Sequence, residues 1–307
     1  LFQTALNDYY SIELAIDYAT LAASCNNELA TEIWNDLLPA YGYEFTKGRL
    51  IWSAWREDFM RREKEDVDEE KFKKIVKRFK EELLLPLNDM KVTYAEFREF
   101  SDKHSSFNFD RASIDEEVKN TRKIHQKVLS YEQKLKKIDD KSHRERIQTY
   151  KIYIESLAED LEEEYVQILY ERMITSCCLN ESAWMDYIHY IQNRPKDWAP
   201  VESNKSMIFR QTELDIINRA LRNCSWSADL YVEKMRVLEV EQKPRLEVQH
   251  TLEKACTIQY KSAEPLVKIW IEYLSYLIRN TNYEDEKQKE ILRSNFDLAW
   301  NKIGRAH

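Results

Sequence analysis

An aromatic pair spaced three residues apart recurs along the chain and constrains the fold more than any other feature. Its clear copies are Trp52 and Trp55, Tyr150 and Tyr153, Trp184 and Tyr187, and Trp270 and Tyr273. Tyr94 and Phe97 form a weaker copy, and two further copies have lost a ring, with Ala15 before Tyr18 and Lys234 after Tyr231. Six steps from Ala15 to Trp270 cover 255 residues, about 42 residues each. A period near 40 is typical of stacked two-helix repeats, in which one position makes the same inter-helix contact each time, so we expect these rings in the interior.

A second amphipathic segment follows each aromatic pair. Residues 71–83, "KFKKIVKRFKEEL", place Phe72, Ile75, Val76 and Phe79 on one face at helical spacing. The repeat is therefore a first helix with the aromatic pair and a second helix with an apolar stripe. About seven repeats follow a leading second-type helix at residues 1–9. The sequence predicts an all-α solenoid, a right-handed superhelical array of TPR-like helix pairs.

The composition agrees with this prediction because it excludes the main alternatives. The only glycines are Gly42, Gly48 and Gly304, and the six prolines are scattered singly. Strand-rich folds need glycine and proline at frequent turns, and phosphate-binding loops need glycine where the backbone meets phosphate. The charged fraction of 33% in runs rich in Leu, Glu, Lys and Arg favours helices instead.

Charge and cysteine content restrict the compartment and the partners. The net charge of −8 argues against a general nucleic-acid coat, although local basic patches remain possible. Five cysteines, an odd number without a C-x-x-C pair, favour a reduced compartment over a disulfide framework. No apolar run approaches the length of a membrane span. The chain begins at Leu1 rather than Met, so we expect it to be part of something longer.

The stretch "NRALRNCSWSADLYVEKM", residues 218–235, has the residue types of a small active site and also those of a joint between helices. Ser227 is a good N-cap, and Asp229 favours the positive end of the helix dipole. Trp226 is placed to pack on Tyr231 as a hydrophobic staple. Because each residue has a role at a helix end, we interpret the stretch as a joint.

The paired helices resemble half-a-tetratricopeptide (HAT) repeats, which occur mainly in RNA-processing factors. Longer phrases carry a more specific resemblance: "FTKGRLIWSAWREDF", "LLLPLNDMKVTYAEFREFSD", "ILYERMITSCCLNESAWMDY", "NRALRNCSWSADLY" and "LEKACTIQYKSAEPLVKIWIEYLSYL". They are similar to the family of U4/U6 small nuclear ribonucleoprotein (snRNP) recycling factors, also called squamous cell carcinoma antigen recognised by T cells. The resemblance runs from about Ala5 to about Ala299. The chain departs from the family at Ser225, where a proline is usual, and at the lost rings of Ala15 and Lys234.

The resemblance implies a non-enzymatic scaffold of pre-mRNA splicing in the nucleus. Its implied partners are splicing proteins, the U4/U6 snRNP, ubiquitin-specific proteases and a second copy of the chain, bound through the C-terminal repeats. The family's repeats fall into two halves. The long charged stretch from Ser113 to Gln148 widens one step to 56 residues, between Tyr94 and Tyr150. We therefore predict N-terminal repeats over residues 1–138 and C-terminal repeats over residues 139–307.

Catalytic and metal-binding arrangements are not apparent in the sequence. The six histidines are isolated from one another, and no H-E-x-x-H motif occurs. Cys177, Cys178 and Cys224 stand at expected helix ends, where small buried hydrophobic residues are common. A Cys–His nucleophile assembled in space is not supported by any local pattern. We predict no catalytic residue, no cofactor and no bound metal.

Two surfaces are candidates for binding. Lys73, Lys77 and Lys80 form one stripe on an expected helix, where they would neutralise RNA phosphates or balance nearby acids. Tyr276 and Trp300 lie off the repeated aromatic positions near the C-terminal end, where an uncapped solenoid exposes apolar surface. We predict that they anchor a dimer or partner interface, which agrees with the dimerisation that the resemblance implies.

Three alternatives to the recycling scaffold remain. The chain could bind RNA directly through its basic helices. It could also be the scaffold of another HAT-repeat factor of splicing or of pre-mRNA 3′-end cleavage. An enzyme is the least supported alternative, because no catalytic constellation is visible.

Overall fold

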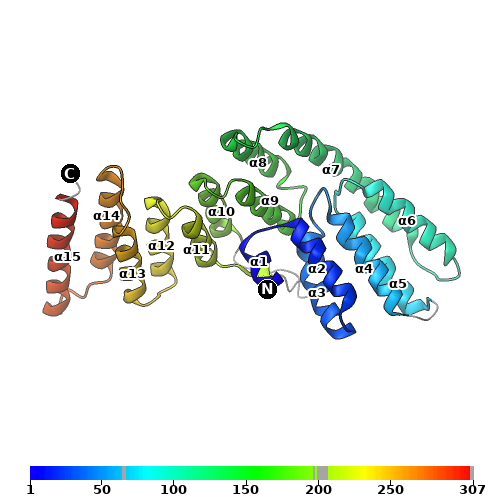
Figure 1. Cartoon of the computed structure of the whole chain (residues 1–307), viewed down its shortest axis with the longest axis horizontal. Helices are drawn as coiled ribbons and strands as arrows, with labels where there is room; N and C mark the ends of the chain where they lie inside the picture. The colour runs from blue at the N-terminus through cyan, green and yellow to red at the C-terminus, as the bar shows by residue number, and fades with distance from the viewer. Residues whose placement is uncertain (64–66, 196–197, 199–206, 305–307) are drawn as a thin grey trace. The chain divides into compact units, whose positions relative to one another are not determined.

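The computed structural model describes residues 1–63, 67–195, 198 and 207–304. Across these residues it contains fifteen α-helices and one 3₁₀-helix and no strand, which confirms the predicted all-α class (Figure 1). Seven antiparallel helix pairs follow the leading helix α1, and each pair begins with the helix that carries the repeated aromatic positions. The first helices of the pairs are α2, α4, α6, α8, α10, α12 and α14. The regular period of the aromatics therefore corresponds to a solenoid of two-helix repeats.

Packing divides the chain into two compact units. The first unit holds residues 1–176 and the described part of residues 197–210. Its helices are α1 (Phe2–Asp8), α2 (Ile12–Ser24), α3 (Asn27–Tyr41), α4 (Gly48–Arg62), α5 (Glu69–Leu83), α6 (Met90–Lys103), α7 (Arg111–Lys137), α8 (His143–Leu157), α9 (Glu163–Ser176) and the 3₁₀-helix η1 (Met207–Arg210). Within this unit α2, α3 and α4 pack on one another, and α8 packs against both α7 and α9.

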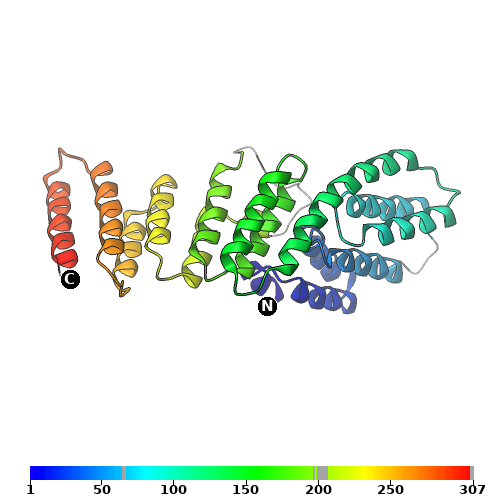
Figure 2. The same cartoon turned by 90° about the horizontal axis from the view of Figure 1, so that it is seen from above.

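The second unit holds the remaining helices. They are α10 (Glu181–Asn193), α11 (Glu213–Asn223), α12 (Ala228–Val240), α13 (Arg245–Cys256), α14 (Glu264–Arg279) and α15 (Glu286–Gly304). Figures 1 and 2 show them as a row in which each helix lies beside the next. The first helices of two successive repeats also meet here, since α12 packs directly against α14.

Seven of the fifteen described α-helices begin at a residue whose side chain caps the free backbone amides of the first turn. The side chains of Ser11, Asn26 and Asp68 accept hydrogen bonds from the amides three residues later, at 3.2, 2.9 and 2.8 Å. Ser227 caps α12 in the same way, with the amide of Leu230 at 3.2 Å. The structure therefore bears out the interpretation of residues 218–235 as a joint between two helices.

The core of the first unit includes a segment that comes late in the sequence. Ile208 and Phe209 of η1 lie in one buried cluster with α2, α3 and α4. Gln167 of α9 donates a hydrogen bond of 2.7 Å to the carbonyl oxygen of Ile208. Part of the connection between α10 and α11 thus completes a core built mainly from residues more than 100 positions earlier. The aromatic period gives no indication of this contact.

The predicted boundary near Asp139 lies inside the first unit, in the turn between α7 and α8. The step widens there because α7, with 27 residues, is the longest helix of the described chain. Despite this length, α7 packs along α8 and α8 packs along α9. The packing of the helices therefore places the division between the two compact units after Ser176. The boundary between N-terminal and C-terminal repeats near Asp139 stays a prediction.

Candidate binding surfaces

The eight aromatics of the clear repeat copies all lie in the interior. Each is at most 6% exposed: Trp52, Trp55, Tyr150, Tyr153, Trp184, Tyr187, Trp270 and Tyr273. The indole N–H groups of two of these tryptophans also donate hydrogen bonds to backbone carbonyl oxygens of residues that precede their own helix. Trp52 Nε1 donates to the carbonyl of Gly42 at 3.1 Å, and Trp184 Nε1 donates to the carbonyl of Cys178 at 2.8 Å. These rings build the repeat and are therefore not available to a partner.

At the two repeat positions without an aromatic ring, Ala15 and Lys234 have different environments. Ala15 is fully buried in the core of the first unit. Lys234 is half-buried on α12, where its ammonium donates a hydrogen bond of 2.8 Å to the side-chain oxygen of Asn218 on α11. Burial, assisted by the nearby charge of Lys254, lowers the pKa of Lys234. The lysine thus links two helices at a position where the other repeats use a ring.

The predicted basic stripe lies on α5, with Phe72, Ile75 and Phe79 facing the core. Lys73 is paired with Glu69 of the preceding turn at 2.5 Å, and Lys80 is paired with Glu117 of α7 at 2.8 Å. Lys77 is exposed and has no ion pair within the part of the chain that the structure describes. The three lysines share one face of α5, on which Lys73 and Lys77 are exposed and Lys80 is half-buried. Two of the three charges are balanced inside the chain, so the stripe offers less free positive charge than its sequence indicates.

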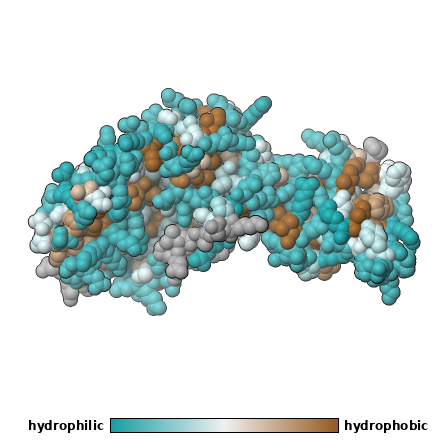
Figure 3. Space-filling view, turned by 180° about the vertical axis from the view of Figure 1, so that it is seen from behind, coloured by the Kyte–Doolittle hydropathy of each residue, from teal (hydrophilic) through white to brown (hydrophobic). Residues whose placement is uncertain are grey.

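The two residues predicted to anchor a C-terminal interface differ in accessibility. Tyr276 on α14 is 6% exposed and its ring lies beside Tyr273 in the core of the second unit. Trp300 on α15 is 82% exposed. Tyr276 therefore supports the fold, and Trp300 is the ring that a partner can reach. Figure 3 shows hydrophobic side chains on the surface at the C-terminal end of the second unit. The exposed apolar residues of α14 and α15 include Ile271, Ile278, Phe296 and Leu298.

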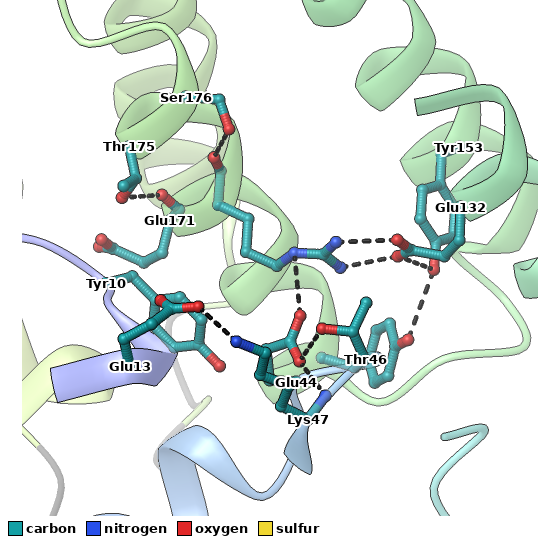
Figure 4. Close-up of polar contacts among 12 residues, drawn as sticks. Tyr10, Glu13, Glu44, Thr46, Lys47, Glu132, Tyr153, Glu171, Thr175 and Ser176 are labelled. Atoms are coloured by element: carbon teal, nitrogen blue, oxygen red, sulfur yellow. Dashed lines mark hydrogen bonds and ion pairs between the residues drawn. The ribbon is translucent and has the colours of Figure 1, made fainter. Parts of the chain in front are cut away.

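A buried polar network joins four segments of the first unit (Figure 4). Arg172 of α9 donates two hydrogen bonds to the carboxylate of Glu132 on α7, at 2.7 and 2.8 Å. Tyr153 of α8 donates to the same carboxylate at 3.4 Å. The Nε of Arg172 lies 3.8 Å from a carboxylate oxygen of Glu44, in the turn between α3 and α4.

Sequence reasoning missed this network. Its signals were a carboxylate inside the apolar stripe of Val128 and Leu135, and an arginine inside "ILYERMI". Either residue alone is as easily assigned to a solvated helix face. Only the tertiary arrangement, in which α7 and α9 both pack against α8, shows that Glu132 and Arg172 meet.

Chemistry at the cysteines is restricted by their environment. All five cysteines are free thiols. Burial raises the pKa of Cys224 to about 11, because the apolar surroundings disfavour the thiolate, and its Sγ donates to the carbonyl of Cys178 at 3.4 Å. A thiol held in its protonated form is a poor nucleophile. Within the described residues, no group of three or more His, Cys, Asp or Glu side chains is arranged to hold a metal ion.

The fold and these surfaces define a helical-repeat protein, in which buried rings build the repeats and exposed charged and apolar groups form the surfaces. None of the helices in the described ranges is both long and apolar enough to cross a lipid bilayer.

The comparisons with known proteins point to splicing factors. No model of a known protein family matches the sequence. The chain is 26% identical over 309 residues to the Homo sapiens protein named "Spliceosome associated factor 3, U4/U6 recycling protein", covering 97% of this chain and 29% of that protein. A Danio rerio protein of the same name is 26% identical over 85% of this chain and 27% of its own length. The "RNA-binding protein 4F" of Drosophila melanogaster is 26% identical over 53% of this chain and 19% of its own length.

The chain therefore spans less than a third of the length of these relatives. Because the alignment with the human protein covers nearly all of this chain, the similarity extends through both units.

Proposed function

We propose that this chain is a protein-interaction scaffold of pre-mRNA splicing, acts in the nucleus and assists the reassembly of the U4/U6 snRNP. One observation carries the proposal: the similarity to proteins named for U4/U6 recycling covers 97% of the chain. The helix pairs fit this role because stacked repeats present extended surfaces to partners. As part of the same proposal, the helix pairs are HAT repeats.

The proposed partners are splicing proteins, ubiquitin-specific proteases and a second copy of the chain. The exposed ring of Trp300 and the exposed apolar residues of α14 and α15 support an interface at the C-terminal end of the second unit. Where such residues form a contiguous surface, they are typical of interaction sites. A scaffold of another HAT-repeat factor would have the same surfaces but would assemble with different particles.

Capture from a nuclear extract tests the scaffold function. The chain is immobilised at near-physiological salt, and U1, U2, U4, U5 and U6 RNAs are measured in the bound fraction. We expect U4 and U6 to be enriched together over the other three RNAs. A parallel capture uses the same RNAs after removal of their proteins. Loss of the enrichment there supports recognition through proteins, and the absence of enrichment from intact extract would overturn the proposal.

Direct RNA binding is the second candidate function. The name of the Drosophila relative, RNA-binding protein 4F, and the exposed lysine face of α5 favour it. Binding through Lys73, Lys77 and Lys80 would be weak and sensitive to salt, because it would rest on phosphate neutralisation. In the capture experiment this function predicts that deproteinised U4/U6 RNA binds as well as the intact particle.

A further inference from the structure

A cavity of about 720 Å³ lies in the first unit, apart from the C-terminal surface and the lysine stripe considered above. It is bounded by the start of α2, the turn between α3 and α4, and helices α7, α8 and α9. Arg172 and Glu132 both line it. Its volume is in the range of sites that enclose a small ligand or a few side chains of a peptide.

The carboxylates that line the cavity are all occupied by groups of the chain itself. Glu132 accepts both hydrogen bonds of Arg172. Glu44 accepts from the hydroxyl of Thr46 at 2.8 Å and from the amide of Lys47 at 2.6 Å. Glu13 is paired with the ammonium of Lys47 at 2.7 Å. The acidic groups are therefore already satisfied and do not require a cationic ligand.

The cations at the mouth of the cavity are less fully used. Lys136 on α7 is exposed and has no ion pair among the residues that the structure describes. Arg146 on α8 uses Nη2 for the carbonyl of Ile138 and for Asp140, both at 3.1 Å, and its other donors have no partner within the described chain. Residues 134–146 carry six cations and three anions. The mouth therefore attracts negative charge.

Part of the remaining wall is apolar or aromatic, and the rest carries uncharged polar side chains such as Asn88 and Gln133. Ile12, Leu129 and Leu135 line the cavity together with the rings of Tyr10 and Tyr150. Burial raises the pKa of both phenols, which keeps these rings uncharged. Such walls suit a bulky apolar side chain, which leaves water on entering the cavity.

We propose that this cavity binds a short peptide segment of a partner protein, in which a carboxylate stands beside a bulky apolar side chain. The carboxylate binds Lys136 and Arg146, and the apolar side chain enters the cavity between α7 and the start of α2. The inference rests on the proposed scaffold function and assigns it one binding site. A peptide fits better than RNA, because a nucleic acid would bring a phosphate at every residue toward the carboxylates of Glu13, Glu44 and Glu132.

The test uses phage-displayed random dodecapeptides selected on the full chain. Enriched peptides are synthesised with a fluorescent label, and their dissociation constants are measured by polarisation. We expect Asp or Glu within two positions of Leu, Ile, Phe or Trp in the enriched set. Lys136→Gln should weaken binding about tenfold, the loss of one charge-assisted contact. Lys137→Gln is the matched control, since Lys137 is exposed on the same turn of α7 but does not line the cavity.

A second variant tests the cavity itself. Ser176 is an exposed residue of the cavity wall, so Ser176→Trp places a large ring there. We expect it to abolish peptide binding and to leave the far-ultraviolet circular dichroism unchanged. Binding that survives in Ser176→Trp, or that falls equally in Lys136→Gln and Lys137→Gln, would overturn the proposal. Enriched peptides that contain no Asp or Glu would also overturn the proposal.

Two further measurements separate the remaining outcomes. A labelled dodecamer of uridine should bind wild type and Lys136→Gln equally, and a loss of RNA binding with no peptide binding would identify RNA as the occupant. U4/U6 capture by the wild-type chain is measured in parallel. Capture without peptide binding overturns the cavity proposal alone, whereas peptide binding without capture overturns the recycling function alone.

Discussion

Arg172 and Glu132 form a two-bond ion pair inside the first unit, with N–O distances of 2.7 and 2.8 Å. The pair joins α9 to α7 across the place where the repeat period widens to 56 residues. Planar guanidinium and carboxylate groups match in this geometry, so the pair fixes orientation as well as charge. It explains why α7, α8 and α9 remain parts of one unit although the sequence pattern breaks between them.

Removing the arginine should destabilise the first unit strongly. Arg172→Met leaves the carboxylate of Glu132 buried without its partner, which typically costs about 3–5 kcal/mol in the free energy of unfolding. Urea unfolding followed by circular dichroism measures the loss. Lys127→Met is the control, because its pair with Asp160 is exposed and should contribute less than about 1 kcal/mol. Equal losses of unfolding free energy in the two variants would show that the buried ion pair contributes no more to stability than the exposed one.

Asp58 should make part of the stability depend on pH. Its burial disfavours the charged form, but hydrogen bonds from Arg62, Trp34 and Arg61 outweigh burial and lower the pKa of the carboxyl. The lowered pKa means that the folded state binds the proton less tightly than the unfolded state. This contribution is therefore complete above the unfolded pKa of about 4 and is lost as the pH falls through the lower folded pKa.

The variant Asp58→Asn tests this dependence. It should lower the free energy of unfolding at pH 7 by about 1–3 kcal/mol, the usual value for hydrogen bonds to a charged group. The difference from wild type should stay constant between about pH 7 and pH 5 and shrink below about pH 4. Urea titrations across this pH range provide the measurement. A difference that is the same at about pH 3 and pH 7 would contradict the assignment.

Trp300 should contribute to self-association and little to folding. The ring is 82% exposed, so Trp300→Ala should change the free energy of unfolding by less than about 0.5 kcal/mol. If Trp300 anchors the proposed dimer, its loss should raise the dissociation constant about thirtyfold, as for an interface residue worth about 2 kcal/mol. Sedimentation velocity over a range of concentrations measures the constant.

Trp226→Ala is the control for that experiment, because Trp226 is the other strongly exposed tryptophan of the second unit, at 51%. We expect the dissociation constant of the Trp226→Ala dimer to equal that of wild type. A wild-type chain that is monomeric at every concentration would contradict the proposed dimer, and a dimer insensitive to Trp300→Ala would place the interface elsewhere. Point variants are preferable to deletion of residues 258–307, because α14 supplies Trp270, Tyr273 and Leu277 to the core.

Neutralising the stripe on α5 tests the RNA-binding alternative. The triple variant Lys73→Gln, Lys77→Gln and Lys80→Gln removes three charges without creating repulsion toward Glu69 and Glu117. If all three lysines neutralise phosphates, the slope of log affinity against log salt should fall by about 2 for single-stranded RNA. Because Lys73 and Lys80 are already paired, we expect a smaller change. A triple Gln variant of Lys261, Lys287 and Lys302 is the matched control, and equal effects would show that only net charge matters.

The repeating aromatics were sufficient to predict the class of fold. Trp52, Trp184 and Trp270 recur because each repeat buries the same position against its neighbour, so one local pattern encodes the same contact in each repeat. Helix ends were also predictable, as at Ser227, because a cap is formed within four residues of sequence. Tyr276 was predicted at an interface and lies in the core instead, because its accessibility is set by how α14 packs on α12.

The sequence by itself therefore determined the all-α class, the pairing of helices within repeats and the burial of the repeated rings, since these depend on contacts between near neighbours. The tertiary structure decided the rest. It placed Glu132 against Arg172, brought Ile208 and Phe209 onto α3, paired two of the three lysines on α5, and left a cavity beside Lys136. These features join residues separated by tens to more than 100 positions, and no local pattern records which distant side chains will meet.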